Sequence, residues 1–110
     1  MPADELDLIQ GTVDVLILKT LSWRPMHGYG VSRWIRERTD GALGIDDAAM
    51  YQALHRLERR GWIESAWGLS ENNRRAKFYQ LTSAGRKQLH AKATTWRRYA
   101  EAVFKVLETA

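Results

Sequence analysis

The chain has 110 residues, which is enough to bury one hydrophobic core but too few for two independent domains. It contains no cysteine, which excludes disulfides, thiolate zinc sites and cysteine nucleophiles and fits a reducing compartment. The formal net charge is +4 at pH 7.

The positive charge is concentrated behind Asp47. Residues 1–47 carry 5 Lys or Arg against 8 Asp or Glu, whereas residues 48–98 carry 11 against 3. The last 12 residues carry 1 Lys against 2 Glu. Such asymmetry favours an anionic partner, because basic side chains on a duplex release condensed counterions. A merely solvated basic surface would give a similar distribution.

Neither a secretory signal nor a membrane span is expected. Asp4, Glu5 and Asp7 stand where a signal peptide would carry positive charge. The apolar run Val13–Leu18 is far shorter than the ~20 residues that span a bilayer. We therefore expect a soluble, cytoplasmic protein.

The first two expected elements are helices with a short break between them. The segment Leu8–Leu21 is apolar over more than one stripe, which is typical of a helix at the centre of a core. Ser22–Pro25 interrupts it, because proline disfavours helix at the residue before it. A second helix is expected over His27–Arg38. Two helices joined by a short turn form half of a helix-turn-helix.

A third helix is expected after a loop. Thr39–Gly44 contains two glycines and an aspartate, a loop pattern, and Leu43–Ile45 is expected to form a short strand. Asp46 or Asp47 can accept free backbone amides and cap a helix that runs through Arg60.

The third helix is amphipathic. Its apolar residues fall on one face: Met50, Ala53, Leu54 and Leu57. The outward face and its flanks carry Ala48, Tyr51, Gln52, His55, Arg56 and Arg59. These side chains include types that bond base edges or phosphates in a major groove wide enough to admit one helix. The alternative is an ordinary amphipathic helix with a solvated basic face.

Two antiparallel strands are expected after Gly61, over residues 62–67 and 77–81, because both segments are rich in aromatic and branched residues. The loop between them, from Ser70 to Lys77, exceeds the two residues of a tight hairpin and should protrude. The loop side chains expected to reach a duplex are Asn72, Asn73, Arg74, Arg75 and Lys77. A helix followed by a basic loop favours duplex binding over the solvated face. The overall expectation is a mainly α fold with a small β-hairpin.

A long last helix is expected from Ala84 to Leu107, capped by Thr82 or Ser83. Its apolar residues are spaced 4, 3, 4, 3 and 4 apart, which is the seam of a coiled coil. These seam residues are Leu89, Ala93, Trp96, Ala100, Val103 and Leu107.

The sequence contains no metal-site or enzyme pattern. His27, His55 and His90 have no cysteines or carboxylate clusters nearby at ligand spacing. No glycine-rich phosphate loop follows a strand, and Ser and His form no nucleophile arrangement. We therefore expect neither a metal, a cofactor nor an enzymatic activity. His27 is expected to cap a helix or touch a phosphate, and Gly28 to allow a close backbone approach.

Several separated motifs carry a family resemblance in order and spacing. They are Pro25–Gly30, Met50–Glu58, Gly61–Ile63 and Asn72–Leu81, followed by Thr82 and Gly85. The chain thereby resembles the PadR family of bacterial winged-helix transcriptional regulators over nearly its whole length.

The resemblance implies a winged helix-turn-helix DNA-binding domain over residues 1–82 and a C-terminal dimerisation helix over residues 83–110. The third helix would be the recognition helix, the loop from Asn72 to Lys77 the wing, and the seam the homodimer contact. Backbone contacts to DNA would lie near the second helix at His27, Gly28 and Tyr29.

Two residues depart from the family pattern. Asp47 and Gln52 stand near the start of the recognition helix and after the tyrosine, where relatives usually carry a small residue and a proline. Gln52 can read a base that proline could not, so the operator sequence cannot be transferred from relatives.

Two roles are considered for Trp96. The resemblance implies that aromatic residues at the dimer interface can line a hydrophobic pore that accepts flat planar compounds, as in some family members. Trp96 is therefore a candidate residue of an effector pocket. The alternative is a core tryptophan that packs against the first helix.

The leading hypothesis is a homodimeric repressor that binds an inverted-repeat operator. For its control, the resemblance implies either release by a small aromatic or lipophilic effector or regulation through abundance alone. The alternative is a winged-helix interaction module whose basic face docks on an acidic protein. This alternative predicts that the protein shows no binding to duplex DNA whose affinity falls steeply with salt concentration.

Overall fold

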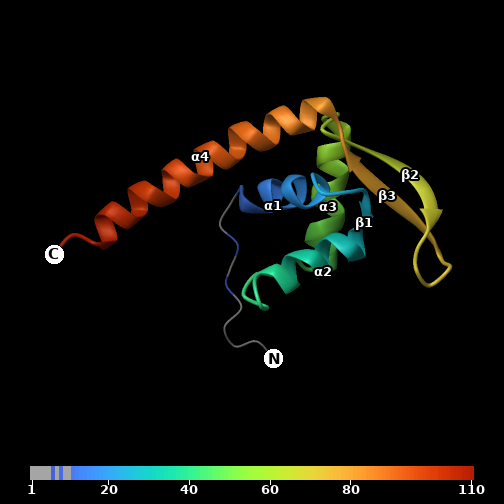
Figure 1. Ribbon diagram of the computed structural model, residues 1–110, viewed down its shortest axis with the longest axis horizontal. Coiled ribbons are helices and arrows are strands. Elements are labelled where there is room, and N and C mark those ends of the chain that lie inside the picture. The colour runs from blue at the N-terminus through green and yellow to red at the C-terminus, as the bar shows by residue number, and fades with distance from the viewer. Residues whose placement is uncertain (1–5, 7, 9–10) are drawn as a thin grey trace.

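The computed structural model describes residues 6, 8 and 11–110. Its elements run in the order shown in Figure 1 and confirm a mainly α fold with a small antiparallel sheet. They are α1 (Thr12–Leu21), β1 (Met26–His27), α2 (Gly28–Arg38), α3 (Asp47–Arg59), β2 (Ile63–Leu69), β3 (Arg75–Leu81) and α4 (Ser83–Leu107).

The core lies where α1 meets α2, α3 and the base of the hairpin. Ile17 and Leu18 of α1 are completely buried, as the apolar pattern of this segment predicts. The apolar face of α3 is buried as predicted, with Leu57 completely enclosed. Burial of each such side chain contributes about 1.5–3 kcal/mol, so this core fixes α3 against α1 and leaves its other face in solvent.

Three helices begin at side-chain caps. The Nδ1 of His27 accepts from the amide of Gly30 at 2.9 Å, which confirms the capping role expected for His27. Asp46, rather than Asp47, caps α3. Thr82 caps α4. Asp and Thr caps are worth about 0.5–2 kcal/mol each, so the sequence defines the start of α3 and α4 locally.

The first helix begins later than expected. Leu8 is not helical, residues 9 and 10 lie outside the described residues, and α1 begins at Thr12. Gly11 precedes it with φ +88°, a left-handed conformation that glycine adopts readily and that interrupts a right-handed helix.

The sheet has the strand order β1-β3-β2, with both pairings antiparallel. The prediction of a strand at Leu43–Ile45 is wrong. These residues form no strand, and the third strand of the sheet is β1. Residues 43–45 are held by side chains of the preceding helical segment instead: the amide of Leu43 donates to Thr39 Oγ1 at 3.0 Å. The hydroxyl of Ser32 donates to the carbonyl of Ile45 at 3.4 Å.

The hairpin loop is shorter than expected. The strands extend to Leu69 and Arg75, so the loop spans 70–74 and Arg75 belongs to β3 rather than to the loop. Lys77, expected where the loop meets the second strand, lies within β3. The amide of Ser70 donates to the carbonyl of Arg74 at 2.9 Å. Asn73 adopts the left-handed conformation, with φ +58°, which asparagine tolerates in tight turns. The loop still protrudes from the body of the molecule (Figure 1).

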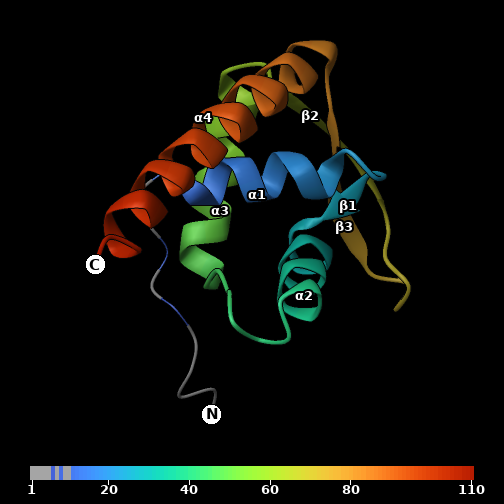
Figure 2. The same cartoon turned by 60° about the vertical axis from the view of Figure 1, so that its left-hand side comes forward.

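Helix α4 leaves the body of the molecule. Its first half crosses α1, and its second half extends past the other elements in both views (Figures 1 and 2). Among the described residues, no helix is both long and apolar enough to cross a membrane.

Candidate nucleic-acid interface

A groove of about 870 Å³ lies between α3, the start of α2 and the hairpin. From α2 and its cap it is lined by His27, Gly28, Tyr29 and Arg33; from α3 by Asp47 and Tyr51; from the hairpin by Trp67, Arg74, Arg75 and Lys77. The fold therefore brings together residues from three segments that are far apart in the sequence.

The outward face of α3 borders this groove. Ala48, Gln52, His55 and Arg59 are exposed, and the opposite face is buried in the core. Tyr51 is 70% exposed and its ring stacks on His55, with centroids 6.3 Å apart. A rigid helix thus presents polar and aromatic side chains to solvent beside a concave surface.

Arg56 lies apart from the other predicted contacts. Its guanidinium forms an ion pair with the buried carboxylate of Asp14 on α1. Arg60 lies 3.9 Å from the other oxygen of the same carboxylate. The side chain of Arg56 is therefore engaged within the fold.

The start of α2 packs closely on α3. A Cβ at Gly28 would lie 3.3 Å from Leu54 Cδ1, tighter than ordinary van der Waals contact. The close backbone approach expected at Gly28 is therefore made to the neighbouring helix α3.

The three cations of the hairpin, Arg74, Arg75 and Lys77, lie in three different environments. Lys77 lies 3.5 Å from Glu58 of α3. The guanidinium of Arg75 lies 4.4 Å from the ring centroid of Trp67, and Arg74 is exposed at the loop. Beside them, burial raises the pKa of the Tyr79 hydroxyl; Lys77 opposes the rise, and Glu58 and Tyr51 add to it.

Residues 17–91 match the model of the Transcriptional regulator PadR-like family. The chain belongs to this family. It is therefore a DNA-binding transcriptional regulator, and the resemblance read from its motifs is confirmed.

Similar proteins of known structure or sequence agree with this assignment. A transcriptional regulator from Clostridium thermocellum is 34% identical and superposes with a TM-score of 0.81, covering 91% of this chain and 97% of that one. A PadR family transcription regulator from Clostridium difficile R20291 is 30% identical with a TM-score of 0.75, covering 88% and 99%. An uncharacterised protein X from Lysinibacillus sphaericus is 29% identical over 102 residues, 93% of this chain and 94% of its own.

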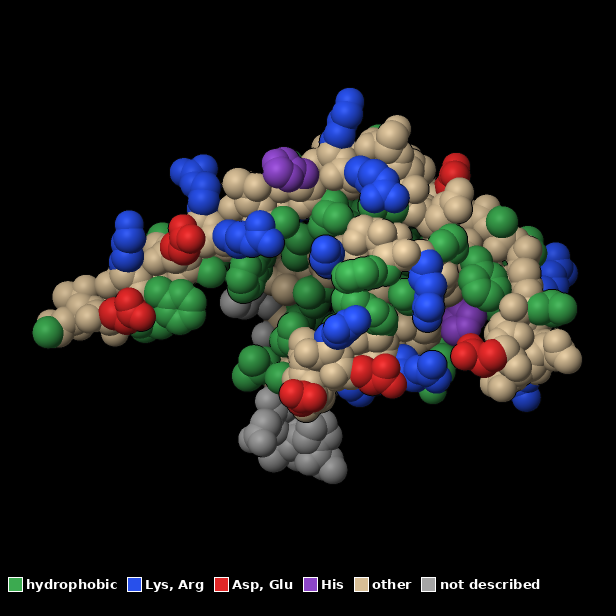
Figure 3. Space-filling view, viewed as in Figure 1, with side chains coloured by type: hydrophobic (Ala, Val, Ile, Leu, Met, Phe, Trp, Pro, Cys, Tyr) green, Lys and Arg blue, Asp and Glu red, His purple; other side chains and the backbone are tan. Residues whose placement is uncertain are grey.

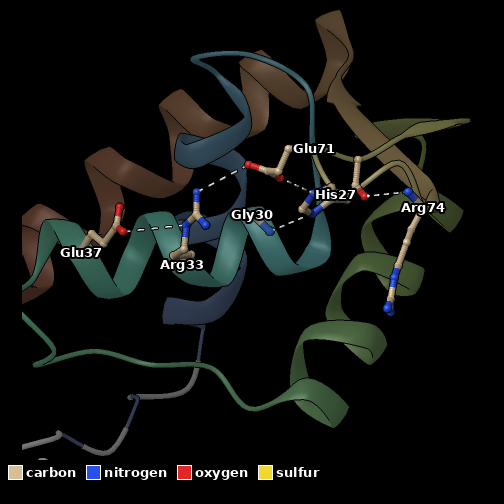
Figure 4. A network of polar contacts seen from close by, with 7 residues as sticks. His27, Gly30, Arg33, Glu37, Glu71 and Arg74 are labelled. Atoms are coloured by element: carbon tan, nitrogen blue, oxygen red, sulfur yellow. Dashed lines mark hydrogen bonds and ion pairs between the residues drawn. The ribbon is translucent and has the colours of Figure 1, made fainter.

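The hairpin of this PadR protein is its wing, and a polar network ties the wing to α2 (Figure 4). Glu71 in the wing loop lies 3.5 Å from His27 Nε2 and 3.9 Å from Arg33. Arg33 also lies 3.8 Å from Glu37 on its own helix. A carboxylate therefore sits beside the basic groups that face the groove.

Sequence reasoning missed Arg33, Trp67 and Glu71. Trp67 is 61% exposed on β2, which is unusual for so large an apolar side chain. Its position opposite Lys77 depends on the register of β2 with β3, which the sequence alone does not contain.

The seam residues of α4 divide into two groups. Leu89, Ala93 and Ala100 are half-buried, whereas Trp96, Val103 and Leu107 are exposed. In Figure 3 hydrophobic side chains line the lower side of the projecting α4 arm, and Lys and Arg side chains stand on its upper side. The indole N–H of Trp96 donates to Thr12 Oγ1 at 3.1 Å, so Trp96 contacts α1 while 38% of its surface stays exposed.

Within the described part of the chain, no three His, Cys, Asp or Glu side chains gather as a metal site would require.

Proposed function

We propose that this PadR protein is a homodimeric repressor that binds an inverted-repeat operator. Two copies of α3, related by a two-fold axis, enter successive major grooves about 34 Å apart. Each wing follows the adjacent phosphate backbone. The repressor acts in the cytoplasm by occupying its operator, and residues 1–82 form the DNA-binding domain.

The exposed face of α3 beside the basic groove is the observation that carries this proposal. We assign base contacts to Ala48, Tyr51, Gln52, His55 and Arg59, all of which are exposed. Arg56 is left out because Asp14 engages it. Phosphate contacts come from the wing, with further backbone contacts from the start of α2. The assigned groups are Asn72, Asn73, Arg74, Arg75, Lys77, His27, Gly28 and Tyr29.

The shape of α4 supports a homodimer through residues 83–110. The helix has 25 residues, a length of roughly 37 Å at ~1.5 Å per residue. In its projecting half Val103 and Leu107 are exposed, and the flanking Tyr99 and Phe104 are more than half exposed. A contiguous apolar surface of this kind marks an interaction site, and a second copy of the same seam would cover it.

We further propose that Trp96 contributes to an effector site for a small aromatic or lipophilic compound. The exposed part of its ring lies at the base of the projecting arm, where two copies would approach. Quenching of tryptophan fluorescence by a compound that also releases DNA supports this site if the quenching is lost in Trp96→Phe. Release without loss of quenching in that variant would contradict it.

The experiment is selection of duplexes from a genomic fragment library by the parent protein and by Gln52→Ala. Removing a base contact should change the selected sequence while leaving the salt dependence of binding unchanged. His90→Ala, an exposed change on α4, is the control and should select the parent's sequence. Identical selections by Gln52→Ala and the parent would contradict the base contact, and no selection by the parent would contradict the function.

A further inference from the structure

The first turn of α1 contains two buried polar side chains, Thr12 and Asp14. Buried polar groups are costly unless they are paired. Both of these are paired with other helices, Asp14 with α3 and Thr12 with α4. The turn therefore contacts the recognition helix on one side and the projecting helix on the other.

The pair between Asp14 and Arg56 lies where both helix dipoles favour it. Asp14 is in the first turn of α1, where negative charge is favourable, and Arg56 is in the last turn of α3, where positive charge is favourable. The Asp14 side chain is only 12% exposed. Its charge therefore needs a cation; Arg56 forms the close pair and Arg60 lies 3.9 Å away, and both attach the end of α3 to α1.

Helix α3 is held by side chains on two opposite flanks. Glu58 contacts Lys77 and accepts a hydrogen bond from the Ser65 hydroxyl, both on the hairpin. Glu58 is two residues from Arg56, so the two side chains leave the helix roughly 200° apart. Together with the buried apolar face they restrain the rotation of α3 about its axis, and this rotation decides where Tyr51 and Gln52 point.

The same turn of α1 is held by α4. The indole of Trp96 donates to Thr12 Oγ1 across 84 residues of sequence. A shift of α4 at Trp96 would therefore act on Thr12, two residues before the carboxylate that holds Arg56.

We propose that the first turn of α1 couples the position of α4 to the recognition helix, with Asp14 as the positioning residue that holds α3 through Arg56. The inference rests on the proposed function, because it concerns how α3 is presented to DNA. In this role Arg56 contacts Asp14 and makes no contact with DNA.

The test compares Asp14→Asn with the parent, using the duplex that the parent selects and a random duplex of equal length. We expect the ratio of selected to random affinity to fall about tenfold, a common size for coupling between sites. A direct DNA contact by Arg56 predicts the opposite, because Asp14→Asn would free the guanidinium and strengthen binding. Stronger binding to the selected duplex would overturn the proposal.

Asp40→Asn is the matched control. Asp40 is exposed in the turn after α2 with φ +50°, which asparagine also tolerates. The control removes the same charge and should keep the parent's ratio. A fall in the ratio as large as that of Asp14→Asn would show a general charge effect and overturn the positioning role.

A charge exchange separates positioning from folding. Asp14→Arg and Arg56→Asp should each lower the ratio, and the double variant should recover part of it because the ion pair is restored in reverse. Recovery will be incomplete, since both charges then oppose the helix dipoles. A double variant no better than the worse single variant would overturn the proposal.

Thr12→Val tests the coupling to α4, because valine keeps the shape and loses the hydroxyl. We expect a smaller fall in the ratio, and no further fall when Thr12→Val is added to Asp14→Asn. Additive effects would show that the two contacts act separately and would overturn the coupling.

Amide hydrogen exchange of the free protein distinguishes failure of this inference from failure of the proposed function. Asp14→Asn should speed exchange in the last two turns of α3 and leave β2 and β3 unchanged. Unchanged exchange in α3 would overturn the positioning role even if the parent binds DNA. A parent that binds no duplex would contradict the proposed function, while the exchange measurement still decides the role of Asp14.

Discussion

The ammonium of Lys77 on β3 lies 3.5 Å from the Glu58 carboxylate on α3. The hydroxyl of Ser65 donates to the other Glu58 oxygen at 2.5 Å. The wing is thereby attached to α3, the proposed recognition helix, through a cation that the sequence indicates as a phosphate contact. Arg75, two residues earlier, lies over Trp67 and has no such carboxylate among its described contacts.

Arg75 should therefore contribute more to DNA affinity than Lys77. Arg75→Ala is expected to weaken binding to all duplexes and to reduce the salt slope by about one. Lys77→Ala should reduce the slope by less, because Glu58 already neutralises part of that charge. Fluorescence anisotropy at several salt concentrations measures both, with Lys105→Ala near the end of α4 as a charge control. Equal slopes for the Arg75 and Lys77 variants would contradict this difference.

Glu71 should weaken DNA binding in the parent protein. Its carboxylate lies beside His27 and Arg33 at the groove, where it would repel phosphate and neutralise a cation. Glu71→Gln is expected to bind all duplexes more tightly and to steepen the salt slope by about one.

Glu64→Gln is the matched control for Glu71. Glu64 is exposed on β2 and contacts Gln80 across the strand pair, outside the lining of the groove. The control should change affinity much less. Weaker binding by Glu71→Gln would instead show that the wing position set by Glu71 matters more than its charge.

The parts of the fold that depend on local sequence were predictable. The helical spacing of Met50, Leu54 and Leu57 predicts both helix α3 and the face that it buries. Asp46 and Thr82 mark helix starts because their side chains bond amides three residues away. These interactions lie within one turn of chain, so a single sequence contains them.

The parts that depend on tertiary pairing were not predictable. β1 is two residues long and exists only because the edge of β3 is available to Met26. Asp14 and Arg56 are 42 residues apart, and no periodicity relates them. The assignment of Arg75 to the loop failed for the same reason, because strand length is set by the register with β2.

Gly85→Ala should destabilise the protein although Gly85 lies in a helix. Alanine usually stabilises a helix by about 1 kcal/mol over glycine. Here a Cβ would lie 2.0 Å from the carbonyl oxygen of Trp62, so the start of α4 must move away from the hairpin. We expect the free energy of unfolding to fall by about 2 kcal/mol, measured by urea denaturation. Ser83→Ala, exposed in the same turn, should change it little, and a stabilised Gly85→Ala would contradict the packing described for this turn.

Val103→Asp should dissociate the proposed homodimer. A charge in the seam would be buried without a partner when two copies meet. Sedimentation should show the parent at twice the mass of the variant, and the variant should stay folded because Val103 is exposed in the single chain.

Thr94→Asp is the control for the seam. Thr94 is exposed on the side of α4 away from the seam, so this variant should sediment as the parent does. Dimers of equal stability for the parent and Val103→Asp would place the subunit contact elsewhere.

The most direct test of the account is the affinity of the parent protein for its selected inverted repeat and for the same repeat with five base pairs inserted at its centre. The insertion turns the half-sites to opposite faces of the duplex, so a dimer with two fixed recognition helices cannot bind both. We expect affinity for the altered repeat to fall toward that for random DNA. Val103→Asp should bind both duplexes equally and weakly. Equal tight binding of the two duplexes by the parent would contradict a dimeric repressor.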